Sequence, residues 1–237
     1  MCTLLMNKAE RDDYWLRFWE ETAQAEHPAK ANGRSSASAA EFFYLLADIC
    51  AKLEFSGESS LLDIGCGSGH VLQMLAPWVR YAVGVDYAQG QVKNAARHLL
   101  KFPHVEVRQA NVLALPFPEG TFDRVLCWSV LQYLPDREQV QTALREVARV
   151  LAPGGRALVA GNPDIQHKAD YLSGIARLDR TPEQKALLRA RNERLLWLAP
   201  EEMADLAGRA GMAAEIRTMD PHIWQSWYMY DLVLARC

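Results

Sequence analysis

Hydrophobic and polar residues near the N-terminus recur with the period of a helix. Residues 10–27 carry aromatic side chains on one turn and a half of such a pattern: Tyr14, Trp15, Phe18 and Trp19. This spacing predicts an amphipathic helix. The residues that follow, 27–38, are rich in Ala, Gly, Ser and Asn, a composition typical of a loop.

A second helix is expected to begin near Ser38. Ser38 and Glu41 have the spacing of a capping box, in which each side chain accepts from the other's backbone N–H. Phe42, Leu45 and Ile49 then form an apolar stripe at helical spacing.

From residue 60 onward, strand-like and helix-like patterns alternate. Short apolar runs predict strands at 60–64, 81–85, 104–109, 122–127 and 156–160, and helical patterns lie at 69–76, 89–101 and 138–151. Such alternation predicts a mostly parallel sheet with helices on both faces. A helix-prone stretch from 162 to 198 follows, then a helix starting near Pro200, and finally two strand candidates at 212–219 and 227–235.

The composition fits one folded domain. The chain has 237 residues, of which 50% are hydrophobic and 23% charged, enough for one α/β domain with a full-sized core. The net charge of −3 provides no field that would hold a polyanion, so nucleic acid is not an expected partner. Five scattered cysteines without a C-x-x-C pair predict reduced thiols rather than disulfides or a zinc site. Without a signal peptide or membrane span, we expect a cytoplasmic protein with no membrane partner.

A glycine-rich turn carries the most chemical information. The run Leu61-Leu62-Asp63-Ile64-Gly65-Cys66-Gly67-Ser68-Gly69 ends a buried strand in an acid and leads at once into a helix. Glycines are needed where φ is positive or where a ligand lies against the backbone. Farther on, Asp86 ends the second strand, where doubly wound folds bind the hydroxyls of an adenosine ribose.

Two features separate this turn from that of dinucleotide oxidoreductases. Their G-x-G-x-x-G pattern would place a third glycine at position 70, where this chain has His70. Asp63 directly precedes the turn, and its charge would repel a pyrophosphate but attract an ammonium or sulfonium group. The sequence therefore favours an adenosine-containing cation as the ligand.

Several motifs in order resemble class I S-adenosylmethionine-dependent methyltransferases, of the type 11/25-like small-molecule branch that acts on quinones, sterols, sugars and natural products. The resemblance rests on Asp63-x-Gly65-x-Gly67-x-Gly69, Asp86, the segment 111–117 with Phe122-Asp123, and the segment 149–155. It covers about residues 60 to 160. It implies a Rossmann-like, doubly wound, mostly parallel seven-stranded sheet with an antiparallel last strand and helices on both faces.

The resemblance also implies a role for each matching position. Asp63, Gly65, Cys66, Gly67 and Gly69 would hold the methionine end of S-adenosylmethionine, Asp86 the ribose hydroxyls, Tyr87, Asn111 and Val112 the adenine, and Trp128 the region of the sulfonium. Asn111 departs from the family's usual Asp, although its carbonyl can still accept from an amino group. Two interpretations of Trp128 remain, a core side chain or a cation–π face.

Methyl transfer from a sulfonium is an in-line displacement, so the enzyme mainly aligns its reactants in a dry site. A general base is required only when the acceptor holds its proton, as a hydroxyl does. The candidates are His167 and His222, which follow strand ends, although a lone His is more commonly a surface or capping residue. Asp164, Gln132 and Tyr133 follow strand ends too and are expected to contact the acceptor, a hydroxyl or amine of a small molecule. No metal-ligand spacing occurs.

The two segments without motifs are expected to form the acceptor pocket. Residues 1–55 would be a helical lid that contributes Trp15 and Trp19, and residues 56–237 the methyltransferase domain. Within it, 162–198 would be a substrate-side insertion contributing Tyr171. The chain would act as a monomer or homodimer. Two alternatives remain: a non-catalytic subunit that binds the cofactor, and an NAD-dependent oxidoreductase.

Overall fold

The computed structural model describes residues 8–25 and 38–236, with side chains of the first helix from Asp13 onward. The first helix, α1 (Lys8–Ala23), corresponds to the aromatic stripe of the sequence. Most of the predicted loop at 27–38 lies outside the described residues. The second predicted helix is confirmed as α3 (Ala39–Leu53), and Ser38 and Glu41 form the predicted capping box.

Seven strands form one sheet in the order β3-β2-β1-β4-β5-β7-β6. They are β1 (Ser60–Ile64), β2 (Tyr81–Asp86), β3 (Val105–Gln109), β4 (Phe122–Trp128), β5 (Leu151–Pro163), β6 (Met212–Thr218) and β7 (Met229–Arg236). The first five pair in parallel, whereas β7 is antiparallel to both β5 and β6. The predicted doubly wound, mostly parallel sheet with an antiparallel last strand is confirmed.

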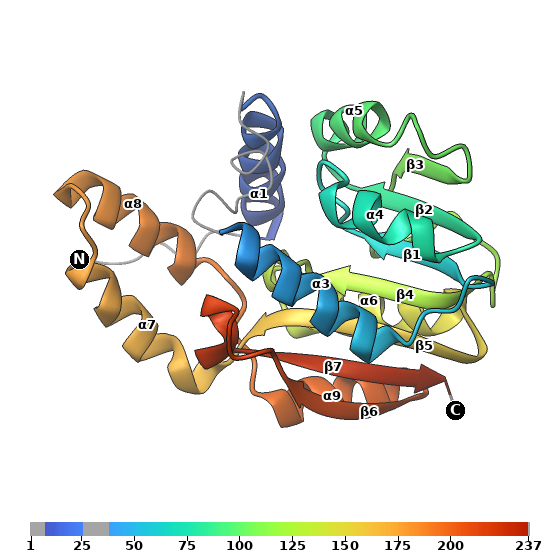
Figure 1. Ribbon diagram of the computed structural model, residues 1–237. Coiled ribbons are helices and arrows are strands. Elements are labelled where there is room, and N and C mark those ends of the chain that lie inside the picture. Colours follow the sequence, from blue (N-terminus) through green and yellow to red (C-terminus); the bar gives the residue numbers. More distant parts are fainter. Residues whose placement is uncertain (1–7, 26–37, 237) are drawn as a thin grey trace.

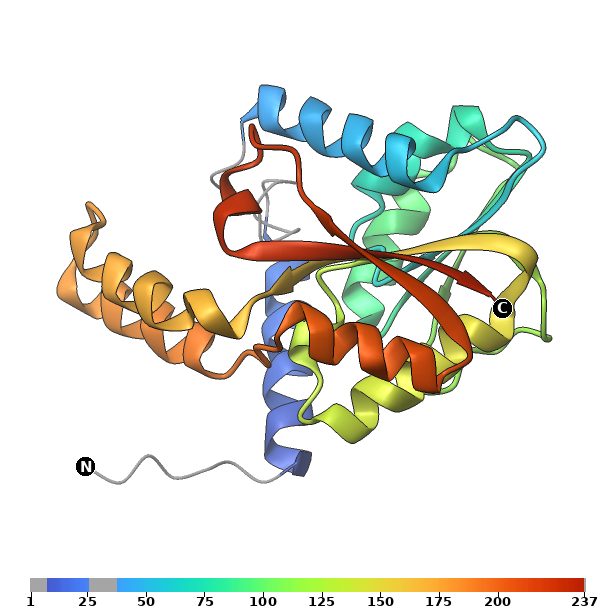
Figure 2. The ribbon, with the colours of Figure 1, turned by 90° about the horizontal axis from the view of Figure 1, so that it is seen from below.

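Helices cover both faces of this sheet. They are α4 (His70–Leu75), α5 (Gln89–His98), α6 (Arg137–Val150), α7 (Lys168–Gly174), α8 (Pro182–Glu193) and α9 (Pro200–Arg209). Figure 2 shows α3, α4 and α5 on one face and α6 and α9 on the other. No helix among residues 8–25 and 38–236 is both long and apolar enough to cross a bilayer.

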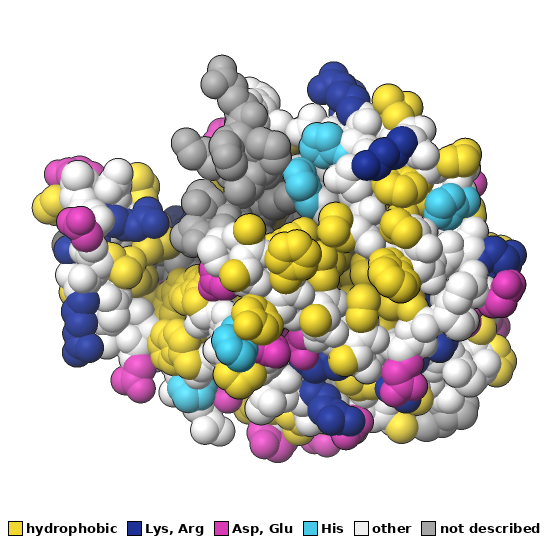
Figure 3. Space-filling view, in the orientation of Figure 1, with side chains coloured by type: hydrophobic (Ala, Val, Ile, Leu, Met, Phe, Trp, Pro, Cys, Tyr) yellow, Lys and Arg dark blue, Asp and Glu magenta, His cyan; other side chains and the backbone are white. Residues whose placement is uncertain are grey.

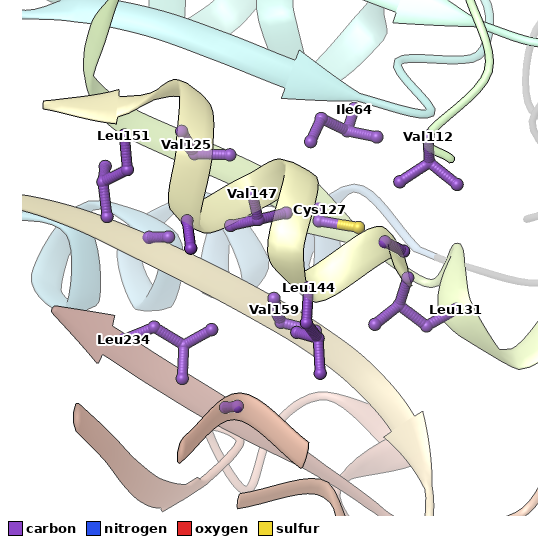
Figure 4. Close-up of a cluster of buried hydrophobic side chains, with 14 of the residues drawn as sticks. Ile64, Val112, Val125, Cys127, Leu131, Leu144, Val147, Leu151, Val159 and Leu234 are labelled. Atoms are coloured by element: carbon purple, nitrogen blue, oxygen red, sulfur yellow. The ribbon is translucent and has the colours of Figure 1, made fainter. Parts of the chain in front are cut away.

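The core consists of two layers that the sheet separates. One lies between the sheet and helices α6 and α9 and includes Val125, Leu144 and Val147, all fully buried (Figure 4). The other packs α3, α4 and α5 against the opposite face, with Ile49 and Leu126 at its centre. Because apolar residues stand on both sides of β1 and β4, these strands contain consecutive rather than alternating apolar residues, as in Leu61-Leu62 and Val125-Leu126-Cys127.

Three segments surround the carboxyl edge of the parallel strands. Helix α1 stands across this edge, close to α5 (Figure 1). The helices α7 and α8 project from the sheet as a pair (Figure 2), within the segment expected to be an insertion. Residues Trp224–Trp227 form a short 3-10 turn just before β7. The fold therefore brings the segments without motifs to the edge where the glycine turn lies.

Candidate functional site

The glycine turn after β1 is formed by backbone that other residues adopt only with difficulty. Gly65 and Gly67 have φ of 72° and 54°. A Cβ on Gly65 would lie 2.3 Å from Cγ2 of Val130, which follows β4. The N–H groups of Gly65 and Cys66 both donate to the carbonyl of Val85, at 2.7 and 3.0 Å. These bonds fix the turn beside the end of β2.

Asp63 lies below this turn and is the unusual group of the site. Its side chain is buried, and Oδ2 has no hydrogen-bond partner among the described residues. Burial, and then the nearby Asp86, raises the pKa of Asp63 to about 7. Its charge in turn raises the pKa values of the thiols of Cys66 and Cys127, after the larger effect of burial. A buried carboxyl oxygen without a hydrogen bond is unfavourable, and a cation or a hydrogen-bond donor would stabilise it.

Asp86 ends β2 and is bound to the same turn. Its Oδ2 accepts from the Gly67 N–H at 2.9 Å, and its Oδ1 accepts from the Ala88 N–H at 2.9 Å. Burial raises the pKa of Asp86, while these backbone donors act in the opposite direction. The Tyr87 N–H also bonds this carboxylate. Since its two oxygens have four lone pairs, the carboxylate can still accept a further hydrogen bond.

The predicted adenine-side residues follow β2 and β3. Tyr87 is exposed, and its carbonyl accepts from the Gln109 side chain at 2.9 Å. Asn111 Oδ1 accepts from the Leu113 N–H at 2.9 Å, so one acceptor position of that oxygen is already used. Val112 is buried in the core. The fold brings these three residues to the same edge as Asp86.

The end of β4 forms the next part of the edge. Trp128 is half-buried and packs against the core layer below α3. Ser129 follows with φ of 54°, uncommon for a residue other than glycine, and its N–H donates to the Ala160 carbonyl at 2.8 Å. This backbone redirects the chain into the short 3-10 turn Leu131–Tyr133.

That turn carries two of the residues predicted to contact the methyl acceptor. Tyr133 contacts two rings of α1, with ring centroids 4.6 Å from Trp15 and 5.5 Å from Trp19. Gln132 is buried, and its carbonyl accepts from the Leu196 N–H at 2.8 Å. Its side-chain Oε1 has no hydrogen-bond partner in the described part of the chain. Helix α1 is thereby packed onto the loop whose Val130 contacts Gly65.

Aromatic residues from three distant segments form a cluster beside this turn. Trp15 of α1, Trp197 and Tyr228 are buried in it together with Leu195, and Tyr171 of α7 packs against it. The rings of Tyr171 and Tyr228 lie 4.6 Å apart. Figure 3 shows hydrophobic side chains in the hollow between the α7–α8 pair and the rest of the molecule. Sequence reasoning missed Tyr228, although the run Trp224-Gln225-Ser226-Trp227-Tyr228 signals an aromatic surface.

The two predicted bases have different surroundings. His167 is half-buried, and its ring meets the Trp227 ring edge-on at 5.9 Å, next to the aromatic cluster. His222 is exposed, stacks on Tyr44 of α3 at 4.0 Å, and its Nδ1 lies 2.9 Å from Asp220 Oδ1.

Asp164, the remaining residue predicted to contact the methyl acceptor, caps a short helical turn. Its Oδ1 accepts from the Gln166 N–H, and its own N–H donates to the Tyr228 carbonyl, both at 2.9 Å. Across the ranges 8–25 and 38–236, no three His, Cys, Asp or Glu side chains gather as a potential metal site. The edge combines the buried Asp63 carboxyl and the half-buried Asp86 carboxyl with a glycine turn and an aromatic cluster.

Residues 62–159 match the model of a protein family described as methyltransferase domain. The chain is 35% identical over 129 residues to an uncharacterized methyltransferase, YcgJ, of Bacillus subtilis, which covers 53% of this chain and 50% of the relative. It is 29% identical to 2-phytyl-1,4-naphtoquinone methyltransferase of Thermosynechococcus vestitus, over 72% of this chain and 67% of that protein. The chain spans between about a third and a half of the length of the first curated relatives it matches.

A solved structure shows the same fold. Geranyl diphosphate C-methyltransferase from Streptomyces coelicolor, solved with Mg²⁺, geranyl diphosphate and S-adenosyl-L-homocysteine, superposes with a TM-score of 0.65. The match covers 96% of this chain and 98% of that one, at 16% identity. This likeness concerns the fold alone.

Proposed function

We propose that the protein transfers the methyl group of S-adenosylmethionine to a small-molecule acceptor. The match of residues 62–159 to the methyltransferase domain family supports this proposal. The methyl group is transferred to the oxygen of a hydroxyl or to the nitrogen of an amine. The second product is S-adenosylhomocysteine. In the same proposal, residues 1–55 form a lid and residues 56–237 the catalytic domain, with 162–198 on the acceptor side.

The unpartnered carboxyl oxygen of Asp63 supports this proposal most strongly. It is buried beside a glycine turn, and a second carboxyl, Asp86, is bound to the same turn. A ligand with an ammonium group would supply the missing partner, whereas the pyrophosphate of a dinucleotide would add negative charge to this pair. The charge of these two carboxyls therefore favours S-adenosylmethionine over NAD.

The residues present fit the cofactor part by part. Asp63 and the backbone of residues 65–69 would bind its methionine portion, and Asp86 would accept from the ribose hydroxyls. Tyr87, Asn111 and Val112 would border the adenine, and Trp128 the sulfonium. When bound, S-adenosylmethionine supplies an activated methyl group. The protein's own contribution is therefore to orient the acceptor and exclude water.

The aromatic cluster supports a flat, hydrophobic acceptor. On the α1 side the rings of Trp19 and Tyr133 are in contact, and on the α7 side the ring of Tyr171 packs against that of Tyr228. Rings of this kind bind apolar ligands at low conformational cost, and their phenol groups can orient a polar atom. Gln132 and Asp164 would hold the backbone of this wall in place through the bonds described above.

For an acceptor hydroxyl, we propose His167 as the base, with His222 second. His167 lies against the aromatic cluster, whereas His222 stacks on α3 and faces Asp220. The His167→Asn variant should lower kcat at least tenfold, while His222→Asn should change it less than twofold. Equal rates for both variants and the wild type would contradict a histidine base and favour catalysis by orientation alone.

Calorimetry with three ligands tests the cofactor. We expect binding of S-adenosylmethionine and S-adenosylhomocysteine and none of NAD. The Asp86→Ala variant should weaken S-adenosylmethionine about tenfold to a hundredfold, because the ribose loses a charge-assisted acceptor. Glu58→Ala is the matched control, since the Glu58 side chain is 91% exposed. Unchanged affinity in Asp86→Ala would contradict the ribose assignment.

Turnover separates an enzyme from a non-catalytic cofactor-binding subunit. Small aromatic and quinone-like acceptors would be screened for formation of S-adenosylhomocysteine. A protein without residues 1–30 should lose most of this turnover, because the rings of α1 close the acceptor side. Full turnover by the shortened protein would contradict the lid.

A further inference from the structure

Trp15 of α1 contains a buried donor without an acceptor. The side chain is 5% exposed, and its Nε1 has no hydrogen-bond partner among residues 8–25 and 38–236. A buried indole N–H normally finds a partner, because it leaves the hydrogen bonds of water behind. By contrast, the buried indole of Trp197 in the same cluster donates to the Asn192 carbonyl at 3.0 Å. Packing alone therefore accounts for the ring of Trp15 but not for its N–H group.

Helix α1 brings this donor to the edge that holds Asp63. The Trp15 ring lies 4.6 Å from the Tyr133 ring. Tyr133 belongs to the loop after β4, and Val130 of that loop packs against Gly65, two residues after Asp63. Figure 1 shows α1 standing across the ends of these parallel strands. Among the described residues, the loop after β4 therefore contacts both the helix with the unpartnered Trp15 donor and the turn beside the unpartnered Asp63 oxygen.

The position of α1 is fixed by contacts away from Trp15. Glu20 Oε2 accepts from the Gly90 N–H at 2.9 Å, and the Ala23 carbonyl accepts from the Asn94 side chain at 2.7 Å. Both donors belong to α5, the helix that follows Asp86. The donor of Trp15 is therefore held in place by the helix that borders the cofactor side of the edge.

The two atoms have complementary chemistry. An indole N–H only donates, and an ionised carboxyl only accepts. An α-amino acid offers a carboxylate to the first and an ammonium to the second. We propose that Trp15 binds the carboxylate of the methionine portion of S-adenosylmethionine, so that α1 completes the cofactor site. This assignment rests on the proposed function, and it moves Trp15 from the acceptor, where the sequence placed it, to the cofactor.

A pair of ligands and a pair of variants test the assignment. Calorimetry would compare S-adenosylmethionine with its decarboxylated analogue, which keeps the sulfonium and the ammonium. Wild-type protein should prefer the intact cofactor by about tenfold or more, since a hydrogen bond to a charged group is lost with the carboxylate. Trp15→Phe keeps a ring and removes the N–H, so it should abolish most of this preference. Trp19→Phe, the control on the same helix, should retain it.

Each outcome decides the matter. A wild-type protein that binds both ligands equally would overturn the assignment, whether or not Trp15→Phe folds. Equal weakening of both ligands in Trp15→Phe would assign Trp15 a packing role and also overturn it. An unchanged preference for the intact cofactor in Trp15→Phe, together with a raised KM for the methyl acceptor, would overturn the assignment as well. Failure of the proposed function itself is a different result, in which the wild-type protein binds neither ligand.

Discussion

Two carboxyl groups are buried in the same sheet, Asp231 on β7 and Asp63 on β1, and only one of them is fully paired. Asp231 Oδ2 accepts from Lys52 Nζ at 2.7 Å, and its Oδ1 accepts from the Gly161 N–H at 2.8 Å. Lys52 also donates to Asp48 at 2.5 Å and to the Thr218 carbonyl at 2.8 Å. Asp63 Oδ2 has no partner among the described residues.

Under the proposed function, this difference separates a carboxyl that supports the fold from one that binds a ligand. Burial raises the pKa of both groups, but around Asp231 the Lys52 ammonium and the Gly161 amide oppose the effect. The charges near Asp63 only add to it, since the neighbour is another carboxyl, Asp86. A folded protein keeps an uncompensated carboxyl of this kind at a cost in stability, which a bound cation offsets.

Removing the partner of the paired carboxyl should have the largest effect on stability. In Lys52→Met, Asp231 remains buried without its counter-ion, and the free energy of unfolding should fall by about 3–5 kcal/mol. Urea denaturation measures this change, with the exposed Lys101→Met as control. Cofactor affinity below the unfolding temperature should stay within about twofold of the wild type. If Lys52→Met kept the stability of the wild type but bound the cofactor more weakly, Lys52 and Asp231 would support the cofactor site rather than the fold.

Asp63→Asn should have the opposite profile. The variant cannot bind an ammonium group as an anion, so S-adenosylmethionine should bind about a hundredfold more weakly. The ligand-free protein should become about 2 kcal/mol more stable at pH 8, because a carboxyl with a raised pKa destabilises the fold once it ionises. Calorimetry and urea denaturation at one pH give both values. Loss of stability in Asp63→Asn would show that the carboxyl supports the fold.

The pH dependence follows from the same group. Asp63 has a pKa of about 7, so its ionised fraction falls about tenfold for each unit below that value. S-adenosylmethionine should therefore bind about tenfold more weakly at pH 6 than at pH 8, while the ligand-free fold becomes more stable as pH falls through 7. Of the groups around Asp63, the thiols of Cys66 and Cys127 stay protonated, and Asp86 changes affinity in the same direction. Asp63→Asn should lose most of the slope; a flat wild-type profile would contradict the raised pKa.

The sequence predicted the sheet, because strands and helices depend on local signals, and the prediction of the cofactor residues rests on local signals of the same kind. Alternating strand and helix patterns gave the strand positions to within a few residues except at β5, which begins at Leu151, directly after α6. Asp63, Gly65 and Asp86 stand at strand ends that any parallel sheet brings together. The pairing of Lys52 with Asp231 joins residues 179 positions apart, so no local pattern could reveal it. No local pattern could reveal the contact between Tyr228 and Tyr171 either, or that the Trp15 N–H lacks an acceptor among the described residues.

The smallest expected effect concerns Asp48, the second carboxylate on Lys52. In Asp48→Asn, the Lys52 ammonium keeps Asp231 and the Thr218 carbonyl, and an amide oxygen can still accept at position 48. The free energy of unfolding should therefore fall by only about 1 kcal/mol, well below the loss in Lys52→Met. Urea denaturation of the two variants side by side measures the difference. Cofactor affinity should not change, because Asp231, to which Lys52 is bound, lies on β7, and the strands β4 and β5 separate β7 from Asp63 on β1. A loss in Asp48→Asn as large as that in Lys52→Met would mean that the ammonium is held chiefly by Asp48, and that Asp231 depends on Gly161 instead.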